Sequence, residues 1–286
     1  KKIKLYFKNK IICEIKINNF FYFNKYEIGK KIFQTSDLKH PGLQIFLKQG
    51  KHFICGKIKN FNSNILHKFK TKKFSEIKKK LVKKKSIVAF HTRNVPHRSH
   101  EWIHEFGIKK CENLLINPMI FQFRPGEFKD RVIRKSYEKL LKLKSDKRIF
   151  LEFYLNYPRY AGPREALFHA VIRRNLGCTH FLIGRDHAGV KNYYKKYSSQ
   201  VLAKHFERKI GIKIITFDEP YFCKKTKEFS NKISNKNCSS KDKIYISGTE
   251  IRKRLLKNQN IPNYMMRKEI ISMLSKKSLV KYKLAK

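Results

Sequence analysis

Two histidines three residues apart, His97 and His100, stand beside arginine and hydroxyl side chains in the segment Phe-His-Thr-Arg-Asn-Val-Pro-His-Arg-Ser-His-Glu, residues 90–101. If they open a helix, both imidazoles lie on one face of its first turn, next to unpaired backbone amides and the positive end of the helix dipole. Phosphate groups bind at such helix ends. The segment therefore predicts nucleotide chemistry, although an isolated His-x-x-His pair is also common on surfaces and at metal sites.

The flanking residues predict the elements that would hold this segment. The apolar run at 86–90 is typical of a buried parallel strand. Asn94 is a suitable N-cap and Pro96 suits a first helical turn, so we expect a helix from near Asn94 to about Phe106, ended by Gly107. The histidines would then follow directly from the carboxyl end of a strand.

A second loop of the same kind follows residues 180–183, a predicted buried strand preceded by a predicted helix at 163–176. The loop reads Gly-Arg-Asp-His-Ala-Gly, residues 184–189, and ligand loops lie at this edge of open α/β sheets. We therefore expect Arg93 and Arg185 to converge on one crevice. Planar guanidinium groups are the side chains best suited to bidentate recognition of an oxyanion.

The composition bounds the class of protein. The chain has 286 residues, 41% of them hydrophobic, and no apolar run of the roughly 18–20 residues that a membrane span needs. Its net charge of +47 would suit a nucleic-acid binder. However, the excess is mostly lysine spread along a chain rich in Asn and Ile, which a nucleotide-composition bias explains, and arginine first occurs at Arg93. We expect neither a membrane nor a specific nucleic acid as partner.

The six cysteines show no C-x-x-C pair. This spacing favours reduced thiols and a cytoplasmic protein. The chain begins at Lys1 without a methionine, so the question of a targeting segment before it stays open.

Three domains are expected, over residues 1–80, 81–220 and 221–286. The first reads as short β segments, and from residue 87 strands and helices alternate, which is typical of a parallel α/β sheet. The predicted strands lie at 3–7, 11–17, 50–58, 114–116, 149–154 and 212–217. A turn is expected at 39–42, a linker or surface helix at 68–85, an irregular polar segment up to 243, and helices after 246–249 and at 266–274.

Five ordered blocks resemble the ATP sulfurylase (sulfate adenylyltransferase) family. They are residues 36–42, Ser-Asp-Leu-Lys-His-Pro-Gly; 92–101; 160–166, Tyr-Ala-Gly-Pro-Arg-Glu-Ala; 184–190; and 246–255, which starts Ile-Ser-Gly-Thr. The resemblance implies an α/β fold with a Rossmann-like nucleotidylyltransferase core, a truncated N-terminal PUA-like β domain and a small C-terminal domain. It also implies a homo-oligomer.

The reaction implied is ATP plus sulfate giving adenosine 5′-phosphosulfate and pyrophosphate, or the reverse, which makes ATP in sulfur oxidation. A sulfate oxygen attacks the α-phosphorus, so the protein positions the substrates and stabilises charge. The implied catalytic residues are Thr92, Arg93, Asn94, His97 and His100. The implied sulfate-binding residues are His91, Arg93, Arg185 and the amide of Ala188. The implied ATP-binding residues are His91, Thr92, Arg93, Asn94, His97, His100, Gly184, Arg185, Asp186 and His187. Mg²⁺ is expected to arrive with ATP, bound mainly by substrate oxygens, so that no metal ligands are assigned to the protein.

Two departures from the family pattern stand out. His91 replaces the usual glutamine, and an imidazole is expected to charge near pH 6.5 and to give an unusual pH dependence. Many relatives carry a zinc site, but here Cys223 and Cys238 have no further cysteine nearby, and Asp242 lies where a histidine would be. Two cysteines do not make a structural zinc site, so we predict no zinc.

Two other functions remain open at this stage. An aminoacyl-tRNA synthetase-like adenylate-forming enzyme would also use a His-x-x-His turn, although the Gly-Arg-Asp-His-Ala-Gly loop argues against it and no Lys-Met-Ser-Lys-Ser segment is present. A non-catalytic RNA-binding protein would use the basic β-rich domain.

Overall fold

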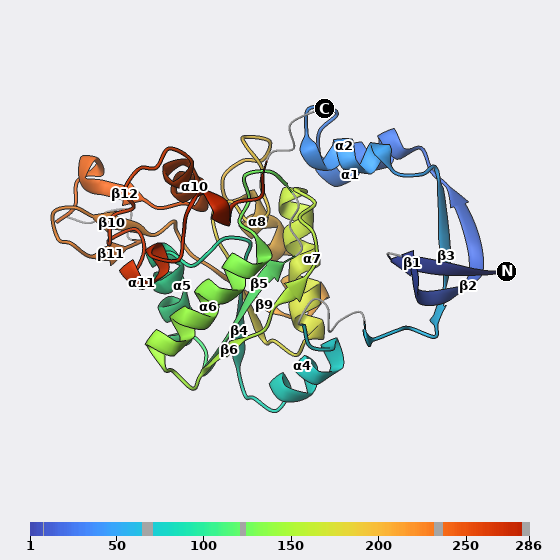
Figure 1. Ribbon diagram of the computed structural model, residues 1–286, viewed down its shortest axis with the longest axis horizontal. Helices are drawn as coiled ribbons and strands as arrows, with labels where there is room; N and C mark the ends of the chain where they lie inside the picture. Colours follow the sequence, from blue (N-terminus) through green and yellow to red (C-terminus); the bar gives the residue numbers. More distant parts are fainter. Residues whose placement is uncertain (8, 65–70, 121–123, 232–236, 282–286) are drawn as a thin grey trace.

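A parallel sheet forms the centre of the computed structural model, which describes residues 1–7, 9–64, 71–120, 124–231 and 237–281 (Figure 1). Its strands are β4 (Ile87–Thr92), β5 (Asn113–Ile120), β6 (Ile149–Leu151), β7 (Tyr154–Leu155), β8 (His180–Ile183) and β9 (Lys213–Thr216). The order is β6-β5-β4-β8-β9, with β7 paired to the end of β5. The chain moves outwards from β4 on one side and from β8 on the other. The sheet therefore has a switch point between β4 and β8, which is where open α/β sheets bind ligands.

Helices cover both faces of this sheet. They are α4 (Phe74–Leu81), α5 (Arg98–Ile108), α6 (Asp130–Lys144), α7 (Gly162–Asn175), α8 (Ser198–His205) and α9 (Glu207–Ile210). Val88 and Phe90 of β4 pack into the core with α5 and α6, whereas Ile87 and Ala89 pack with α4 and α7. Because successive side chains of a strand point to opposite faces, a strand covered on both sides is apolar throughout.

The helix after β4 begins later than the sequence predicts. Its N-cap is His97, not Asn94, and it continues through Gly107 to Ile108. Val95 precedes Pro96, and a residue before proline is disfavoured in the helical conformation. Gly107 lies inside the helix and does not end it; its lack of a side chain serves packing, because a Cβ there would meet Val88 and Leu182, both at 3.1 Å.

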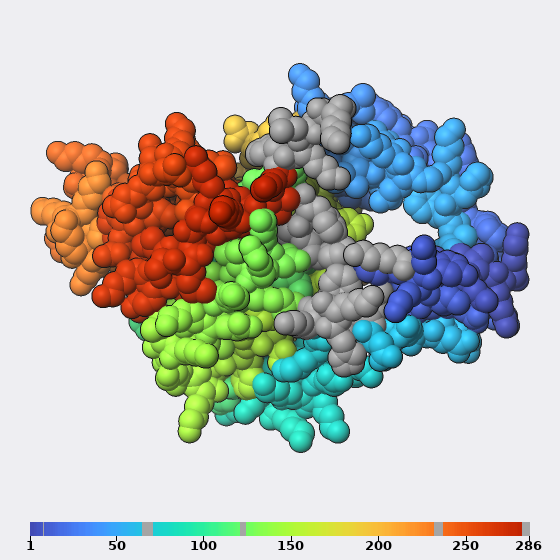
Figure 2. All heavy atoms as spheres, viewed as in Figure 1, coloured from blue at the N-terminus to red at the C-terminus, as the bar shows by residue number. Residues whose placement is uncertain are grey.

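The three N-terminal β segments expected from the sequence form an antiparallel sheet, but two helices that the sequence did not predict lie between the second and the third. The strands are β1 (Lys2–Phe7), β2 (Lys10–Tyr22) and β3 (His52–Lys59), and the helices between β2 and β3 are α1 (Lys25–Phe33) and α2 (Pro41–Lys48). The turn expected at 39–42 lies two residues earlier, where the His40 amide donates to the Asp37 carbonyl. His40 then caps α2 by accepting a hydrogen bond from the Leu43 amide. In Figures 1 and 2 the sheet stands beside the central body. Tyr194 joins the two parts by donating to the Phe33 carbonyl.

The linker or surface helix expected at 68–85 is α4 over part of its length, and residues 68–70 lie outside the described ranges. The strand expected at 149–154 is divided into β6 and β7.

The C-terminal residues form a small sheet and two helices against the central body. The strands are β10 (Tyr221–Cys223), β11 (Phe229–Ser230) and β12 (Lys243–Tyr245), and the helices are α10 (Gly248–Leu256) and α11 (Lys268–Ile271). The segment expected to be irregular thus contains short strands. Ile251 and Met266 share one hydrophobic cluster with Val88 of β4, and Figure 2 shows the C-terminal residues lying directly on the body. The division at residue 221 stays a prediction.

Cys223 and Cys238 form a disulfide, with Cα atoms 6.1 Å apart. The expectation that all cysteines are reduced is therefore wrong for this pair. The two residues are 15 apart in sequence, and the pairing of β10 with β12 brings them close together. Cys13, Cys55 and Cys111 are free thiols, as is Cys178.

Candidate active site

A cavity of about 300 Å³ lies at the carboxyl end of β4 and β8, at the switch point of the sheet. Most of its wall comes from three segments: the end of β4 with the residues that follow it, the loop 184–189 that follows β8, and the start of α10. The two loops singled out from the sequence therefore do meet in one pocket. The predicted site residues that line it are His91, Thr92, Arg93, Asn94, His100, Gly184, Arg185, Asp186, His187 and Ala188.

The loop after β4 is held by contacts to the other two segments. The Thr92 hydroxyl accepts a hydrogen bond from the Asn94 amide at 3.1 Å. Arg93 donates to the Gly189 carbonyl at 3.4 Å, and its guanidinium lies 4.8 Å from the centre of the Tyr160 ring. One arginine thus links both predicted loops.

The loop after β8 is fixed mainly through its backbone. The Ser199 hydroxyl donates to the His187 carbonyl at 2.9 Å, and the Tyr197 amide donates to the Arg185 carbonyl at 2.9 Å. The Arg185 guanidinium lies 3.0 Å from a carboxylate oxygen of Glu219. Ala188 has a φ of 60°, in the left-handed region.

The paired histidines lie at different depths. Their rings stack with centroids 3.6 Å apart, but His100 lines the pocket and His97, which caps α5, does not. Nδ1 of His100 lies 3.3 Å from the Tyr137 hydroxyl. Burial lowers the pKa of His97 to about 3. Burial, followed by the proximity of His97 and His104, holds the pKa of His100 well below its usual value. Both rings are therefore neutral at physiological pH.

The start of α10 contributes pocket residues that were not predicted as site residues: Ser247, Gly248, Thr249 and Arg252. Arg252 donates to the Asn94 side chain and lies 3.2 Å from a carboxylate oxygen of Glu127. The available signal was the Ser-Gly-Thr segment before a helix, which carried part of the resemblance to the family but was given no place in the site. Ser247 does cap α10, accepting from the Glu250 amide at 3.2 Å.

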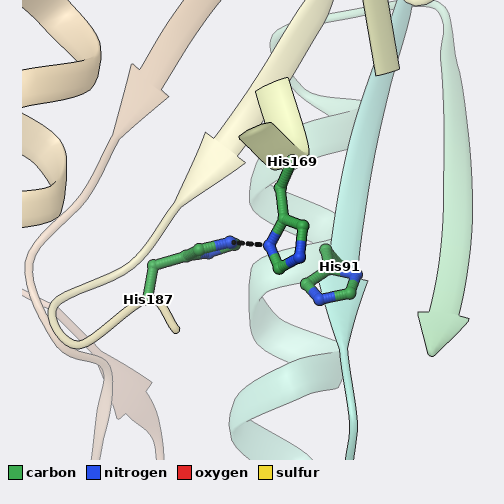
Figure 3. A group of neighbouring side chains, drawn as sticks. All are labelled: His91, His169 and His187. Carbon is green, nitrogen blue, oxygen red and sulfur yellow. Dashed lines mark hydrogen bonds between the residues drawn. The ribbon is translucent and has the colours of Figure 1, made fainter. Parts of the chain in front are cut away.

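Histidines from three elements form one side of the pocket (Figure 3). They are His91 at the end of β4, His169 of α7 and His187 of the second loop, and each offers a ring nitrogen within 4.8 Å of the others. Figure 3 shows His187 pointing at His169, with Nε2 and Nδ1 3.1 Å apart. His169 and its neighbour on α7, Arg173, were not predicted as site residues. Only the packing of α7 beside β4 brings them close to His91.

The expected charging of His91 near pH 6.5 is wrong. Burial, followed by the charge of Arg173 and the nearby His187, holds the pKa of His91 well below that value. Burial, then Arg173 and Arg93, likewise lower the pKa of His187 to about 3. The positive charge of the pocket therefore comes from guanidinium groups, and the arrangement suits a multiply charged anion.

The parallel sheet, its switch-point pocket and the cluster of guanidinium groups define an α/β nucleotidyltransferase. The family model described as ATP-sulfurylase matches residues 68–277, and the model of a PUA-like domain matches residues 1–63. The chain belongs to the ATP-sulfurylase family. The resemblance, the Rossmann-like α/β fold class and the PUA-like N-terminal part predicted from the sequence are thereby confirmed.

Curated relatives support the same assignment. The chain is 35% identical over 279 residues to a sulfate adenylyltransferase of Pyrococcus abyssi, an alignment that covers 95% of this chain and 72% of the relative. It is 34% identical over 277 residues to a sulfate adenylyltransferase of Ignicoccus hospitalis, covering 94% and 71%.

A solved structure, a hexameric APS kinase from Thiobacillus denitrificans, has a similar fold. The TM-score is 0.64 at 15% identity, and the match covers 96% of this chain and 48% of that one. At this identity the likeness supports the fold alone. No helix within the described ranges is long and apolar enough to cross a membrane.

Proposed function

We propose that this chain transfers the adenylyl group of ATP to sulfate, giving adenosine 5′-phosphosulfate and pyrophosphate, or catalyses the reverse reaction. The observation that carries the proposal is the meeting of two arginines from separate loops, Arg93 and Arg185, in one pocket at the switch point of the sheet. Two guanidinium groups suit a tetrahedral oxyanion as the second substrate beside the nucleotide.

The proposed mechanism is direct attack of a sulfate oxygen on the α-phosphorus of ATP. Arg93 and Arg185 hold and orient the sulfate, aided by the Ala188 amide, and His100 donates to the phosphates as charge builds up on the departing pyrophosphate. Thr92 and Asn94 keep the loop in place, and residues 184–187 line the nucleotide. Positioning and charge stabilisation supply the rate, and no covalent intermediate with the protein is needed.

His97 contributes to this site through His100. It lies outside the pocket wall, but its ring stacks on that of His100. His97 therefore supports the phosphate-binding histidine.

Magnesium enters as part of the substrate, MgATP. Both carboxylate oxygens of Glu165 in the pocket wall are used by backbone amides, those of Arg159 and Ala161. The other carboxylate among the described wall residues is that of Asp186. One carboxylate does not make a cage for the ion, so the phosphate oxygens of ATP would supply most of its ligands.

The test is pyrophosphate release from ATP with sulfate or molybdate, together with ATP synthesis from adenosine phosphosulfate and pyrophosphate. Arg93→Ala is expected to reduce the rate by about two orders of magnitude, as removal of a transition-state charge partner does. His97→Ala is expected to do the same. Arg208→Ala, on the exposed side of α9, is the matched control and should keep the wild-type rate.

Near wild-type rates in both Arg93→Ala and His97→Ala would refute the assignment. Pyrophosphate release that depends on an amino acid and tRNA would favour the synthetase-like alternative, and RNA binding without any pyrophosphate release would favour the binding protein. We further propose that the chain is cytoplasmic and forms a homo-oligomer. Light scattering of the purified protein measures its mass in solution and so tests the oligomeric state.

A further inference from the structure

The three histidines of the pocket wall have the residue types of a metal site, so their hydrogen bonds decide what they can bind. A metal needs a lone pair from each ring, and a neutral imidazole has only one. The question for each ring is therefore which nitrogen carries the hydrogen.

His91 is the clearest case. The Arg173 guanidinium donates to its Nδ1 at 2.7 Å. A guanidinium has donors only, so Nδ1 must accept and the hydrogen must be on Nε2. The one lone pair of His91 is thus used by Arg173.

The other two rings follow the same logic. Nε2 of His169 faces a carboxylate oxygen of Glu165 at 3.6 Å, which favours the hydrogen on that nitrogen. Nδ1 of His169 lies 3.1 Å from Nε2 of His187, so one of these two nitrogens donates and the other uses its lone pair. With the lone pair of His91 used by Arg173, only one of the three lone pairs is left. The cluster therefore does not have the three lone pairs of a metal site, and the hydrogen on Nε2 of His91 gives it a donor of the kind that suits an anion.

The environment of Arg173 is unusual for a charged side chain. It is fully buried, and within the described residues no carboxylate lies within ion-pair distance of it. Its other contacts are the His169 carbonyl at 3.3 Å and the faces of Tyr154 and Phe181, at 4.6 and 5.6 Å. Burial lowers its pKa only to about 10, so it stays charged. A buried, uncompensated charge is costly for stability, which points to a role in the pocket.

We propose that Arg173 is a positioning residue of the anion subsite, which holds His91 in the Nε2–H tautomer so that this side chain offers the pocket a hydrogen-bond donor and not a metal ligand. The anion concerned is the sulfate of the proposed function, on which this part of the inference rests. Arg173 itself stays behind the wall and does not touch the substrate.

The tautomer can be measured without any activity, by nitrogen NMR of the full chain labelled with ¹⁵N-histidine, with His91→Gln to assign the signals of His91. We expect protonated Nε2 and unprotonated Nδ1 in the wild type and in Arg174→Met, an exposed control on the same helix. Arg173→Met should lose this single tautomer, and Arg173→Lys, which keeps a donor, should retain it. An Nδ1–H tautomer in the wild type, or the same tautomer in Arg173→Met, would overturn the proposal. So would stoichiometric binding of added Zn²⁺ that shifts the His91 signals.

A double-mutant cycle separates positioning from a general structural role. Glutamine has an N–H donor that needs no tautomer control, so His91→Gln should remove the need for Arg173. Arg173→Met is expected to raise KM for sulfate about 10-fold with His91 present, the loss expected for one charge-assisted hydrogen bond. In the His91→Gln background the same change should alter KM less than about 2-fold. An equal effect in both backgrounds would contradict positioning, whereas wild-type protein without sulfate-dependent pyrophosphate release would contradict the proposed function and leave the NMR test standing.

Discussion

Alanine in place of Gly248 is expected to damage the pocket, although this residue starts a helix. A Cβ at this position would lie 2.3 Å from Cγ of Asn94 and 2.4 Å from its amide oxygen. Non-bonded carbon atoms keep about 3.5–4.0 Å apart, so the contact is too short by more than about 1 Å. Asn94 is not free to move away, because Arg252 donates to its side chain and is itself paired with Glu127.

The magnitude follows from these contacts. Extra atoms in a packed site cost about 1–3 kcal/mol, and a lost hydrogen bond to a charged group costs about 1.5–3 kcal/mol. Helix propensity alone predicts the opposite sign, because alanine is favoured over glycine by roughly 1 kcal/mol in a helix. We expect Gly248→Ala to lower the free energy of unfolding by about 1–3 kcal/mol. We also expect kcat/KM to fall about 10-fold or more, since Asn94 belongs to the loop that carries Arg93.

Urea denaturation and pyrophosphate release measure the two effects. Gly50→Ala is the matched control, because a Cβ at Gly50 would meet no heavy atom within 4 Å. That variant should keep the wild-type activity and should not lose stability. If Gly248→Ala proves as stable and as active as Gly50→Ala, the close packing of α10 against Asn94 does not restrict this position and the reasoning is refuted.

Three further predictions concern other contacts. Arg252→Met should lower kcat/KM about 10-fold, because Asn94 loses its anchor, and a double-mutant cycle with Asn94→Ala checks this, since additive effects would speak against the link. Stability should fall as the pH drops from about 6.5 towards 3, because the unfolded chain takes up a proton on His97 near pH 6.5, whereas burial lowers the pKa of His97 in the folded chain to about 3. Urea denaturation at about pH 7.5 and about pH 5 should show a smaller loss of stability in His97→Gln than in the wild type. Equal losses in the two proteins would count against this prediction. Reduction of the disulfide between Cys223 and Cys238, 15 residues apart, should lower the free energy of unfolding by up to about 3 kcal/mol. Thermal unfolding with and without a reductant measures this effect, and the stability of Cys223→Ser should not respond to the reductant. A wild-type protein that does not respond either would mean that the pair is not bonded in solution.

The central sheet and the edge that carries the pocket could be predicted because burial on both faces leaves a direct mark on sequence. The strand His180–Ile183 was predicted with its observed bounds, and β4 differs only at its ends. The positions of the two ligand loops then follow from the direction of parallel strands. The resemblance to the family, which was confirmed, added the substrates that no apolar pattern can indicate.

Contacts between distant residues could not be predicted in the same way. Arg252 and Asn94 are 158 residues apart, and Arg173 and His91 are 82 apart. Both pairs depend on how α10 and α7 pack against the end of β4, which local patterns do not contain. The start of α5 was misplaced for a local reason, because the Pro96 signal for a first turn competes with its effect on the preceding residue.

In this pocket, different side chains supply the positive charge and the neutral hydrogen-bonding groups. Its charge comes from guanidinium groups. Its histidines act as neutral hydrogen-bonding groups, because burial lowers the pKa of His187 to about 3 and holds that of His91 well below its usual value. Neither group therefore changes charge between about pH 6 and pH 8.5. KM for sulfate should accordingly be constant over this range in steady-state assays, and a KM that rises with a midpoint near pH 6.5 would show that a pocket histidine is charged when sulfate binds.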